Sequence, residues 1–158
     1  MGGLEHRSLA EPAFPGDDGQ VDPALVPVLG DPWATLAQLG GARVFVPIVA
    51  VLGERAADGG DKNADMAAVL MTGADGRRAL LAFSSVARLE TWNPQARPVP
   101  VYGQAAAQSA LAEGASALVL DLGQAHWQVV ETDDLGHLAA GDALVRTEAG
   151  TAWVRPAT

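Results

Sequence analysis

Two serines followed by an arginine form the first pattern in this sequence that is able to bind a ligand. Ser84 and Ser85 come directly after an apolar run, and Arg88 follows three residues later. A helix that begins after these serines presents unpaired backbone N–H groups, which attract anions. Arg77 and Arg78 add positive charge nearby in the sequence. The pattern predicts either a site for an anionic metabolite or amino acid, or ordinary N-capping, which the lack of a glycine-rich phosphate loop favours.

A loop after the first apolar run has carboxylates at a spacing used for calcium. Asp61, Asn63 and Asp65 stand where an EF-hand loop has its first three ligands. Met66 stands where that loop needs a glycine, and Thr72 stands where it needs a bidentate glutamate. We therefore predict a solvated loop and no metal site, since Asp, Asn and Gly also gather in loops for turn formation alone.

A second acidic group lies around residue 134. Asp133 and Asp134 precede His137 by four and three residues, so a helix would place all three on one side, near Glu131. Such a group is a conceivable metal site. Carboxylates at a helix start and a histidine near its end are also what the helix dipole favours, so we predict capping and no metal.

The histidines give no pattern for catalysis. His6 lies near the N-terminus, His126 flanks an apolar run and His137 belongs to a predicted helix. They accompany neither a Gly-x-Ser-x-Gly nucleophile elbow nor a His-x-x-x-His metal pair. We therefore predict no catalytic residue, no cofactor and no enzyme. An enzyme that uses a carboxylate with His126 or His137 is the hypothesis with least support.

Four tryptophans can serve either the core or an interface. They are Trp33, Trp92, Trp127 and Trp153. Tryptophan is enriched at protein interfaces as well as in cores. Trp92 stands at the end of a predicted helix, just before Asn93 and Pro94, where its ring can project from the surface. We take Trp92 as an interface candidate and assign most of the other rings to packing.

The composition excludes several kinds of chemistry and partner. The chain has 158 residues, 49% hydrophobic and 18% charged, which suits one globular domain. It has no cysteine, so disulfides, thiolate metal sites and cysteine nucleophiles are excluded. Ten Lys and Arg against 19 Asp and Glu give a net charge of −9. An acidic chain lacks the basic surface that nucleic acids and anionic membranes require.

The sequence predicts a cytoplasmic protein. No apolar segment follows the first residues, so we expect no secretory signal. The longest apolar stretch, residues 44–52, is about half of the ~20 residues that span a bilayer. The excess of Arg over Lys, with Lys62 as the single lysine, is typical of a GC-rich bacterial genome.

Hydrophobic periodicity and turn residues define the expected elements of the N-terminal half. Residues 1–22 lack periodicity and are expected to form a disordered tail. We predict helices at 23–29 and 32–39, where Asp22 and Asp31 each precede a proline. The strands of an antiparallel meander are expected at 43–52, 64–71 and 77–83. Pro47 indicates an edge strand, a bulge or a break.

The second half alternates between helices and strands. The expected helices are 86–92, 104–113 and 132–140, and the expected strands are 117–121 and 127–130. Residues 96–102, which contain Pro98 and Pro100, are expected to be an extended connection. We predict one α+β domain at 23–142, with an antiparallel-dominated mixed sheet of about five strands (a β-meander, then helix crossovers) and helices packed on it. Residues 143–158 form a C-terminal extension with a possible short strand at 152–154.

The order of these motifs resembles the SseB family N-terminal domain, of the actinobacterial type. The motifs are Val-Phe-Val-Pro at 44–47, Asp-Met at 65–66, Asp-Gly-Arg at 75–77, Ala-Phe-Ser-Ser at 82–85 leading to Leu89 and Trp92, Ala-Arg-Pro-Val-Pro at 96–100 and Ala-Leu-Val-Leu-Asp at 117–121. The likeness covers about residues 23–140 and depends on order and spacing, since each motif alone is turn or core chemistry. The resemblance implies a small cytoplasmic α+β domain with no established catalytic residues.

We therefore expect a non-enzymatic protein-interaction or self-association module, with an unidentified protein partner or a homodimer. Its docking surface is expected to be apolar or to contain tryptophan. The alternative is a sensor for a small anionic metabolite or amino acid at the Ser84 and Ser85 helix start. The candidate ligand or interface residues are Ser84, Ser85, Arg88 and Trp92.

Overall fold

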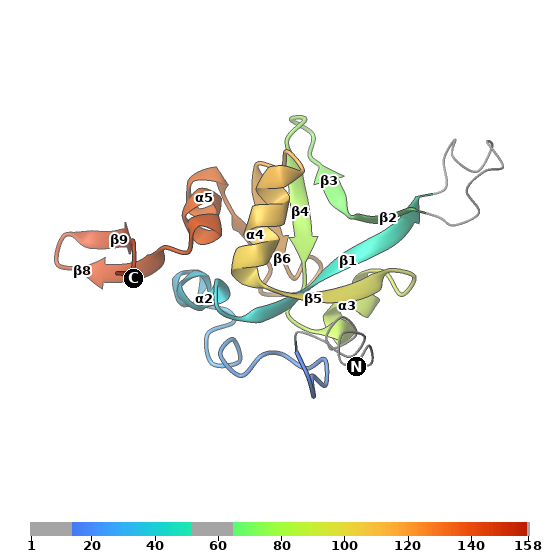
Figure 1. Ribbon diagram of the computed structural model, residues 1–158, viewed down its shortest axis with the longest axis horizontal. Coiled ribbons are helices and arrows are strands. Elements are labelled where there is room, and N and C mark those ends of the chain that lie inside the picture. The colour runs from blue at the N-terminus through green and yellow to red at the C-terminus, as the bar shows by residue number, and fades with distance from the viewer. Residues whose placement is uncertain (1–13, 52–64, 158) are drawn as a thin grey trace, which may run out of the picture.

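A computed structural model of the chain describes residues 14–51 and 65–157 (Figure 1). Its helices are α2 (Pro32–Leu39), α3 (Val86–Trp92), α4 (Gly103–Ala112) and α5 (Thr132–Ala140). Its strands are β1 (Arg43–Val51), β2 (Asp65–Ala68), β3 (Leu70–Thr72), β4 (Arg78–Ala82), β5 (Arg97–Tyr102), β6 (Ala117–Leu120), β7 (Gln128–Val130), β8 (Ala143–Thr147) and β9 (Gly150–Val154). The chain is a single α+β domain, as predicted.

The strands before residue 131 form two groups that meet edge to edge. One group has the order β2-β1-β5, and the other has the order β3-β4-β6-β7. The N–H of Phe45 donates to the carbonyl of Phe83 (2.7 Å), and the reverse bond is 2.8 Å. Val69, between β2 and β3, donates to Pro47 (3.2 Å) and accepts from Leu81 (3.3 Å). The β4·β6 pair is parallel and the other strand pairs are antiparallel, so the predicted antiparallel-dominated sheet is confirmed.

Pro47 lies in a strand that is paired on both sides, so of the three alternatives that this proline indicated the edge strand is wrong. β1 pairs with β5 on one side, where Pro47 stands opposite Pro98. On its other side, β1 contacts Phe83 through Phe45 and then pairs with β2 from Ile48 onward. Pro47 falls at this change of partner, so its missing N–H leaves no gap in a regular ladder.

Residues 97–102 form the edge strand β5, where the sequence predicted a connection without pairing. Pro98 and Pro100 stand opposite Pro47 and Phe45. Phe45 turns its N–H and C=O toward Phe83, away from β5. In an antiparallel ladder, the residue opposite such a position also turns its backbone N and C=O away from the partner strand. The backbone nitrogens of Pro98 and Pro100 therefore face the open edge of β5, where no hydrogen bond is lost. Because the two prolines are two residues apart, both occupy such positions in one strand.

The predicted helix at 23–29 is a series of turns instead. The N–H of Leu25 donates to Asp22 (2.8 Å), and the N–H of Leu29 donates to Leu25 (3.0 Å). Pro27 has no N–H to donate and its ring opposes a carbonyl four residues earlier, which prevents a regular helix. The expected helix at 32–39 is confirmed, and the Asp31 side chain accepts from the N–H of Ala34 (3.1 Å).

Residues 14–22 pack on the domain and are not part of a disordered tail. The carbonyl of Gly19 accepts from the N–H of Val86 (2.9 Å), which joins this segment to α3. Val21 packs against the main core, whose fully buried members include Leu25. The Gly-, Pro- and Asp-rich composition of residues 14–22 predicted disorder. The segment is ordered because it contacts distant residues, which its own composition does not reveal. Residues 1–13 lie outside the described residues.

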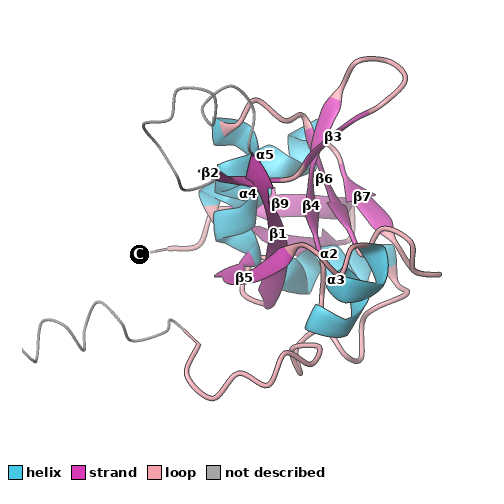
Figure 2. Ribbon diagram, turned by 90° about the vertical axis from the view of Figure 1, so that its right-hand side faces the viewer, coloured by secondary structure: helices cyan, strands magenta, loops and turns pink. Residues whose placement is uncertain are grey.

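The two faces of the sheet are covered unequally. Leu80, Leu118 and Val130 point into the main core, beneath α2, α4 and α5. The opposite face carries Leu81 and Val119, which belong to a smaller core with residues of α3. Figure 2 shows α3 in front of the lower part of the sheet. The face under α3 is thus covered by a helix of seven residues.

Residues 143–154 form a β-hairpin, of which the sequence predicted a short strand at 152–154. β8 and β9 pair antiparallel, with Leu144 opposite Trp153. Figure 1 shows the hairpin beside α5, at the end of the molecule away from β2. The guanidinium of Arg146 lies 4.2 Å from the ring of Trp33 in α2.

Across the described residues, no helix is long and apolar enough to cross a membrane.

Substitution of Gly103 tests the close contact between α4 and α2. A Cβ at Gly103 would lie 2.0 Å from the carbonyl oxygen of Leu39, so a backbone segment would have to move. We expect Gly103→Ala to lower the free energy of unfolding by about 1–3 kcal/mol or more, measured by urea denaturation. The control is Gly41→Ala, where a Cβ has open space, with an expected change below about 1 kcal/mol. Equal effects of both would contradict this packing.

Candidate functional site

Ser84 and Ser85 have different roles at the junction of β4 and α3. The side chain of Ser85 accepts from the N–H of Arg88 (3.2 Å), which confirms the predicted N-cap. Ser84 is fully buried and caps nothing; its Oγ donates to Oδ2 of Asp121 (2.7 Å). Of the two serines predicted to cap the helix, Ser85 is therefore the cap and Ser84 is a buried partner of Asp121.

Asp121 occupies the position that the sequence analysis assigned to an anionic ligand. Its Oδ1 accepts from the N–H of Ser84 (2.7 Å), and its Oδ2 accepts from Nη1 of Arg88 (2.8 Å). The same Nη1 donates to Oγ of Ser84 (3.0 Å). The side chain of Asp121 is 1% exposed, so this carboxylate is held inside the protein. An internal carboxylate therefore accepts from Ser84 and from the side chain of Arg88, next to the start of α3.

Parallel pairing of β4 with β6 brings this group together. Ala82 stands opposite Leu120, so the residues that follow both strands meet at one end of the sheet. Asp121 has a φ of 59°, the left-handed conformation, and its N–H donates to Ala82 (2.9 Å). The sequence analysis missed Asp121, although an acid directly after the apolar strand 117–120 was a usable signal.

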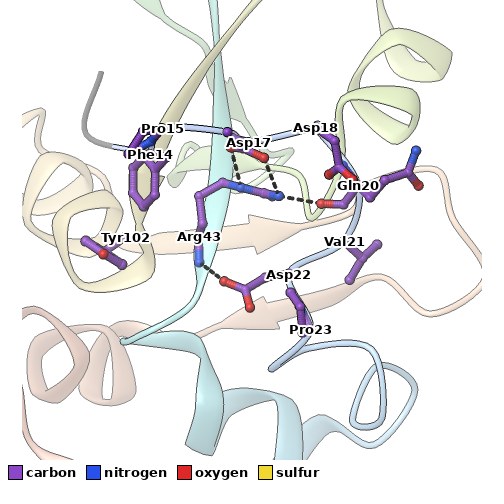
Figure 3. A pocket seen from close by; sticks show the side chains of 11 residues that line it. Phe14, Pro15, Asp17, Asp18, Gln20, Val21, Asp22, Pro23, Arg43 and Tyr102 are labelled. Carbon is purple, nitrogen blue, oxygen red and sulfur yellow. Dashed lines mark hydrogen bonds and ion pairs between the residues drawn. The ribbon is translucent and has the colours of Figure 1, made fainter. Parts of the chain in front are cut away.

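Arg43 is a buried cation that the sequence analysis did not identify. Its side chain is 7% exposed, and its Nε lies 2.9 Å from Oδ2 of Asp17. Nη2 donates to Oδ1 of Asp17 (3.0 Å) and to the carbonyl of Gln20, and Nη1 donates to the carbonyl of Ser84 (3.1 Å). Figure 3 shows the guanidinium enclosed by the segment that carries Asp17 and Gln20. Through Ser84, this pair joins the pair of Arg88 and Asp121.

The backbone of Arg43 is held by a second carboxylate. The N–H groups of Arg43 and Ala24 donate to the side chain of Asp22 (2.8 Å each). Partial burial opposes ionisation of Asp22, but these two hydrogen bonds and the charge of Arg43 together lower its pKa below the ordinary value. Asp22 is therefore ionised at neutral pH and anchors the start of β1.

A shallow depression of about 480 Å³ opens beside this pair (Figure 3). Phe14 and Tyr102 form one wall, with ring centroids 4.7 Å apart. Asp17, Asp18 and Asp22 line it with Arg43, whose guanidinium is already bound by protein groups. The depression is thus acidic and offers an anion no free positive charge.

Trp92 does not project from the surface. Its ring is half-buried and lies 5.6 Å from the ring of Phe83, within the smaller core. Arg77 and Arg78 also lie away from Ser84, at the opposite end of β4. Arg77 bonds to Glu131 (3.1 Å), and Arg78 bonds to the carbonyl of Glu113 (3.0 Å). Of the candidates, the structure brings together Ser84, Ser85 and Arg88.

The acidic group around residue 134 is divided among other contacts. Asp134 accepts from Nε1 of Trp153 (2.9 Å), and the Trp153 ring stacks on His137 at 5.2 Å. Nδ1 of His137 lies 2.8 Å from Oδ2 of Asp142. Within residues 14–51 and 65–157, no three acidic or histidine side chains are placed to hold a metal. The predicted match to the helix dipole is confirmed, since Asp133 and Asp134 lie in the first turn of α5 and His137 lies in its last turn. The predicted side-chain cap is not, because Glu131 is the N-cap residue and makes no such bond.

One part of the sheet surface carries apolar side chains that line a groove. We call it the open face; it consists of Met71, Ala79, Ala117, Val119 and Val129, of which Ala117 and Val119 are buried at the bottom of the groove. Met71 is 39% exposed and Val129 is 37% exposed. The open face lines a groove of about 190 Å³. It extends the surface that α3 covers, on the same side of the sheet.

The opposite charges of Arg77 and Glu131 flank the open face. Arg77 directly precedes β4 and Glu131 directly follows β7, and both line the groove. They bond to each other (3.1 Å) beside Ser116, the residue before β6, whose Oγ also accepts from Nε of Arg77 (3.3 Å). Both side chains are at least half exposed. Asp61 and Asn63 of the predicted solvated loop lie outside the described residues.

Residues 26–137 match the family model of the SseB protein N-terminal domain, which is well over half of the chain. The matched part includes the Ser84 and Asp121 contacts and the open face, and it ends before the β8·β9 hairpin. The comparison with curated proteins gave no match, and the comparison with solved structures gave none either. The actinobacterial type stays a prediction.

Loss of Arg43 is expected to destabilise the whole domain. Arg43→Met leaves the carboxylate of Asp17 and two carbonyl groups without their donor, and breaking a buried pair costs about 3–5 kcal/mol. The control Arg77→Met removes an exposed pair, for which we expect about 0–1 kcal/mol. Urea denaturation measures both. A loss for Arg43→Met as small as the control would contradict the structural role of this cation.

The attachment of the hairpin is expected to weaken in strong acid. Hydrogen bonds from Arg155 and His137 lower the pKa of Asp142 from 3.8 to about 2. Because the pKa of Asp142 is lower in the folded state than its ordinary value, the ionised carboxylate stabilises the folded state at every pH above that ordinary value. This contribution to stability is lost as the pH falls through about 2. The indole N–H signal of Trp153, followed by NMR, should report the change. Asp142→Asn should abolish this pH dependence, and Glu148→Gln in the hairpin turn should keep it.

Proposed function

The chain belongs to the SseB family, matched through its N-terminal domain, and we propose that this domain is a non-enzymatic module that binds a protein partner through the open face. The observation that carries the proposal is the exposure of Met71 and Val129 on an otherwise apolar sheet surface. Exposed apolar surface with a polar rim is typical of protein-binding sites.

The coverage of the sheet supports this choice of surface. A sheet in an α+β domain buries its apolar faces under helices. Among the described helices, α3 packs on this face, where its Leu89 shares a buried cluster with Leu81, Phe83 and Val119. Met71 and Val129 lie beyond this cluster on the same face and are 39% and 37% exposed. Burial of such side chains by a partner contributes about 25 cal/mol for each Å² removed from water.

The polar groups support a binding role more than a chemical one. Ser84, Asp121 and Arg88 are the described set that most resembles reactive chemistry, and they bond to one another. A general base needs a free site to accept a proton from a substrate. Both oxygens of Asp121 already accept hydrogen bonds inside the protein.

The ligand-sensor alternative has weaker support. A small anion at the start of α3 would have to displace the buried carboxylate of Asp121 from Ser84 and Arg88. The net charge of −9 also disfavours nucleic acid as a partner. We place the module in the cytoplasm, on its composition alone, and give it a protein partner.

Affinity capture with matched variants tests the proposed docking surface. Val129→Asp puts a charge in the open face, whereas Val154→Asp puts the same charge on β9, at a residue that is 46% exposed. We expect wild type and Val154→Asp to retain the same protein from a native lysate. Val129→Asp is expected to retain at least about tenfold less of that protein, because burying a charge in an interface costs more than about 1.4 kcal/mol. Equal recovery with all three baits would contradict the proposal.

A further inference from the structure

We propose that the partner of the open face binds by strand addition: an extended segment of another protein pairs with the outer edge of β7, at Val129. The inference rests on the proposed function and deepens it, because Val129 belongs to the open face. It adds the backbone conformation of the bound segment and its chemistry, which is apolar at alternate positions and free of acidic side chains.

β5 and β7 are the two outer strands of the described sheet. In the strand order β3-β4-β6-β7, β7 pairs with β6 on one side and with no described strand on the other. β5 has the same position in the order β2-β1-β5, whereas β2 and β3 lie where the two groups meet. Figure 2 shows β7 beside β6 at the border of the sheet.

The edge of β5 is closed to an added strand. Its outward positions are Pro98 and Pro100, which have no N–H to donate. Proline at such positions is one of the ways in which proteins prevent unwanted strand pairing. β7 consists of Gln128, Val129 and Val130 and has neither a proline nor a charged side chain. The two outer strands thus differ in the feature that decides whether another strand can pair with them.

Val129 directs both of its backbone groups outward. The N–H of Asp121 donates to the carbonyl of Ala82 (2.9 Å), so this N–H faces β4. Because N–H groups alternate in direction along a strand, the N–H of Val119, two residues earlier, faces β4 as well. Val119 stands opposite Val129, and such a pair in an antiparallel ladder turns its backbone groups away from each other. The N–H and C=O of Val129 therefore point to the outer edge of β7.

An extended backbone is the partner that fits these two groups. In strand addition, one residue of the partner accepts from the N–H and donates to the C=O of the same edge residue, and such main-chain bonds supply the affinity. A helix has no free backbone groups along its length to offer, because its N–H and C=O groups bond to one another. The outward groups of Val129 therefore select an extended segment as the occupant.

Side chains and charges define the sequence of this segment. Trp127 and Val129 are 51% and 37% exposed, and aromatic and β-branched residues form favourable pairs across strands. Alternate side chains of an added strand lie on the side of the sheet that carries the open face, next to Val129. Glu131 and Asp133 follow β7 and are exposed, and the chain has a net charge of −9. We therefore expect apolar side chains at alternate positions of the segment and no acidic ones.

The first experiment selects short random peptides displayed on phage, with the folded full chain as the target. The tightest peptide is synthesised, and calorimetry measures its dissociation constant for wild type and variants. Val129→Pro removes the outward N–H and keeps an apolar side chain at a position of the kind that Pro98 and Pro100 occupy in β5. Val129→Thr is the matched control, because it keeps both the N–H and the branched side chain. Circular dichroism and urea denaturation check that each variant is folded.

We expect Val129→Pro to raise the dissociation constant at least about tenfold, because a carbonyl group of the peptide loses its donor. Val129→Thr is expected to change the dissociation constant less than about threefold, as surface substitutions usually do. The selected peptide is expected to have apolar residues at alternate positions.

The second experiment changes the peptide and uses the wild-type chain, so it does not depend on the folding of a variant. N-methylation of one backbone amide at a time removes a single N–H from the peptide. In an added strand, the N–H groups at alternate positions face β7, and the others face away from it. We expect methylation to weaken binding at least about tenfold at central positions of one alternate set, and less than about threefold at those of the other.

The outcomes separate strand addition from the proposed function. A peptide that methylation weakens equally at every position would overturn strand addition, as would a library that yields no peptide or a peptide that binds all variants equally. If Val129→Pro keeps the peptide and Val129→Asp loses it, strand addition is overturned and the proposed function stands, with a partner that covers the open face without pairing with β7. Wild-type dimers that Val129→Pro dissociates would assign the edge to a second copy and overturn the inference of a partner segment.

Discussion

The buried guanidinium of Arg43 is the contact on which the rest of the structure depends. A buried charge is tolerated only when it is paired and its hydrogen bonds are satisfied. Arg43 meets this requirement with acceptors from two distant parts of the chain, Asp17 and Gln20 before α2 and Ser84 after β4. The segment 14–22 must therefore be ordered wherever β1 is formed. One side chain thus joins the N-terminal segment, the central strand and the start of α3.

A second ion pair extends this arrangement to the end of β4. Asp121 bonds to Ser84 and Arg88, so both ion pairs meet at the end of β4. Together they hold α3 against one end of the sheet. Each of these charged side chains is hydrogen-bonded or ion-paired to another group of the same chain, so these contacts stabilise the fold. Function is then better sought on the apolar surface that α3 leaves uncovered.

Local signals predicted much of the fold, and contacts between distant residues explain the failures. Asp31 with Pro32, Ser85, Gly114 and Gly141 each act on their own neighbours, and the helix ends they predict agree with the structure. The role of Ser84 depends on a residue 37 positions away, and no local pattern contains that information. β5 was missed for a similar reason, since its prolines are acceptable only because β1 pairs with it in one register. The capping role predicted for the serines therefore holds for Ser85, and the buried contact of Ser84 with Asp121 was missed.

The open face follows from how the sequence limits α3. Ser85 begins the helix, and Pro94 opposes its continuation beyond Trp92. Seven residues at about 1.5 Å each give a helix of about 10 Å, too short to cover strands that continue to Met71 and Val129. The ion pairs of Arg43 and Arg88 fix this helix at one end of the face. The uncovered surface is consequently part of the sheet itself, so a partner that bound there, as proposed, would not bear the cost of ordering a mobile segment.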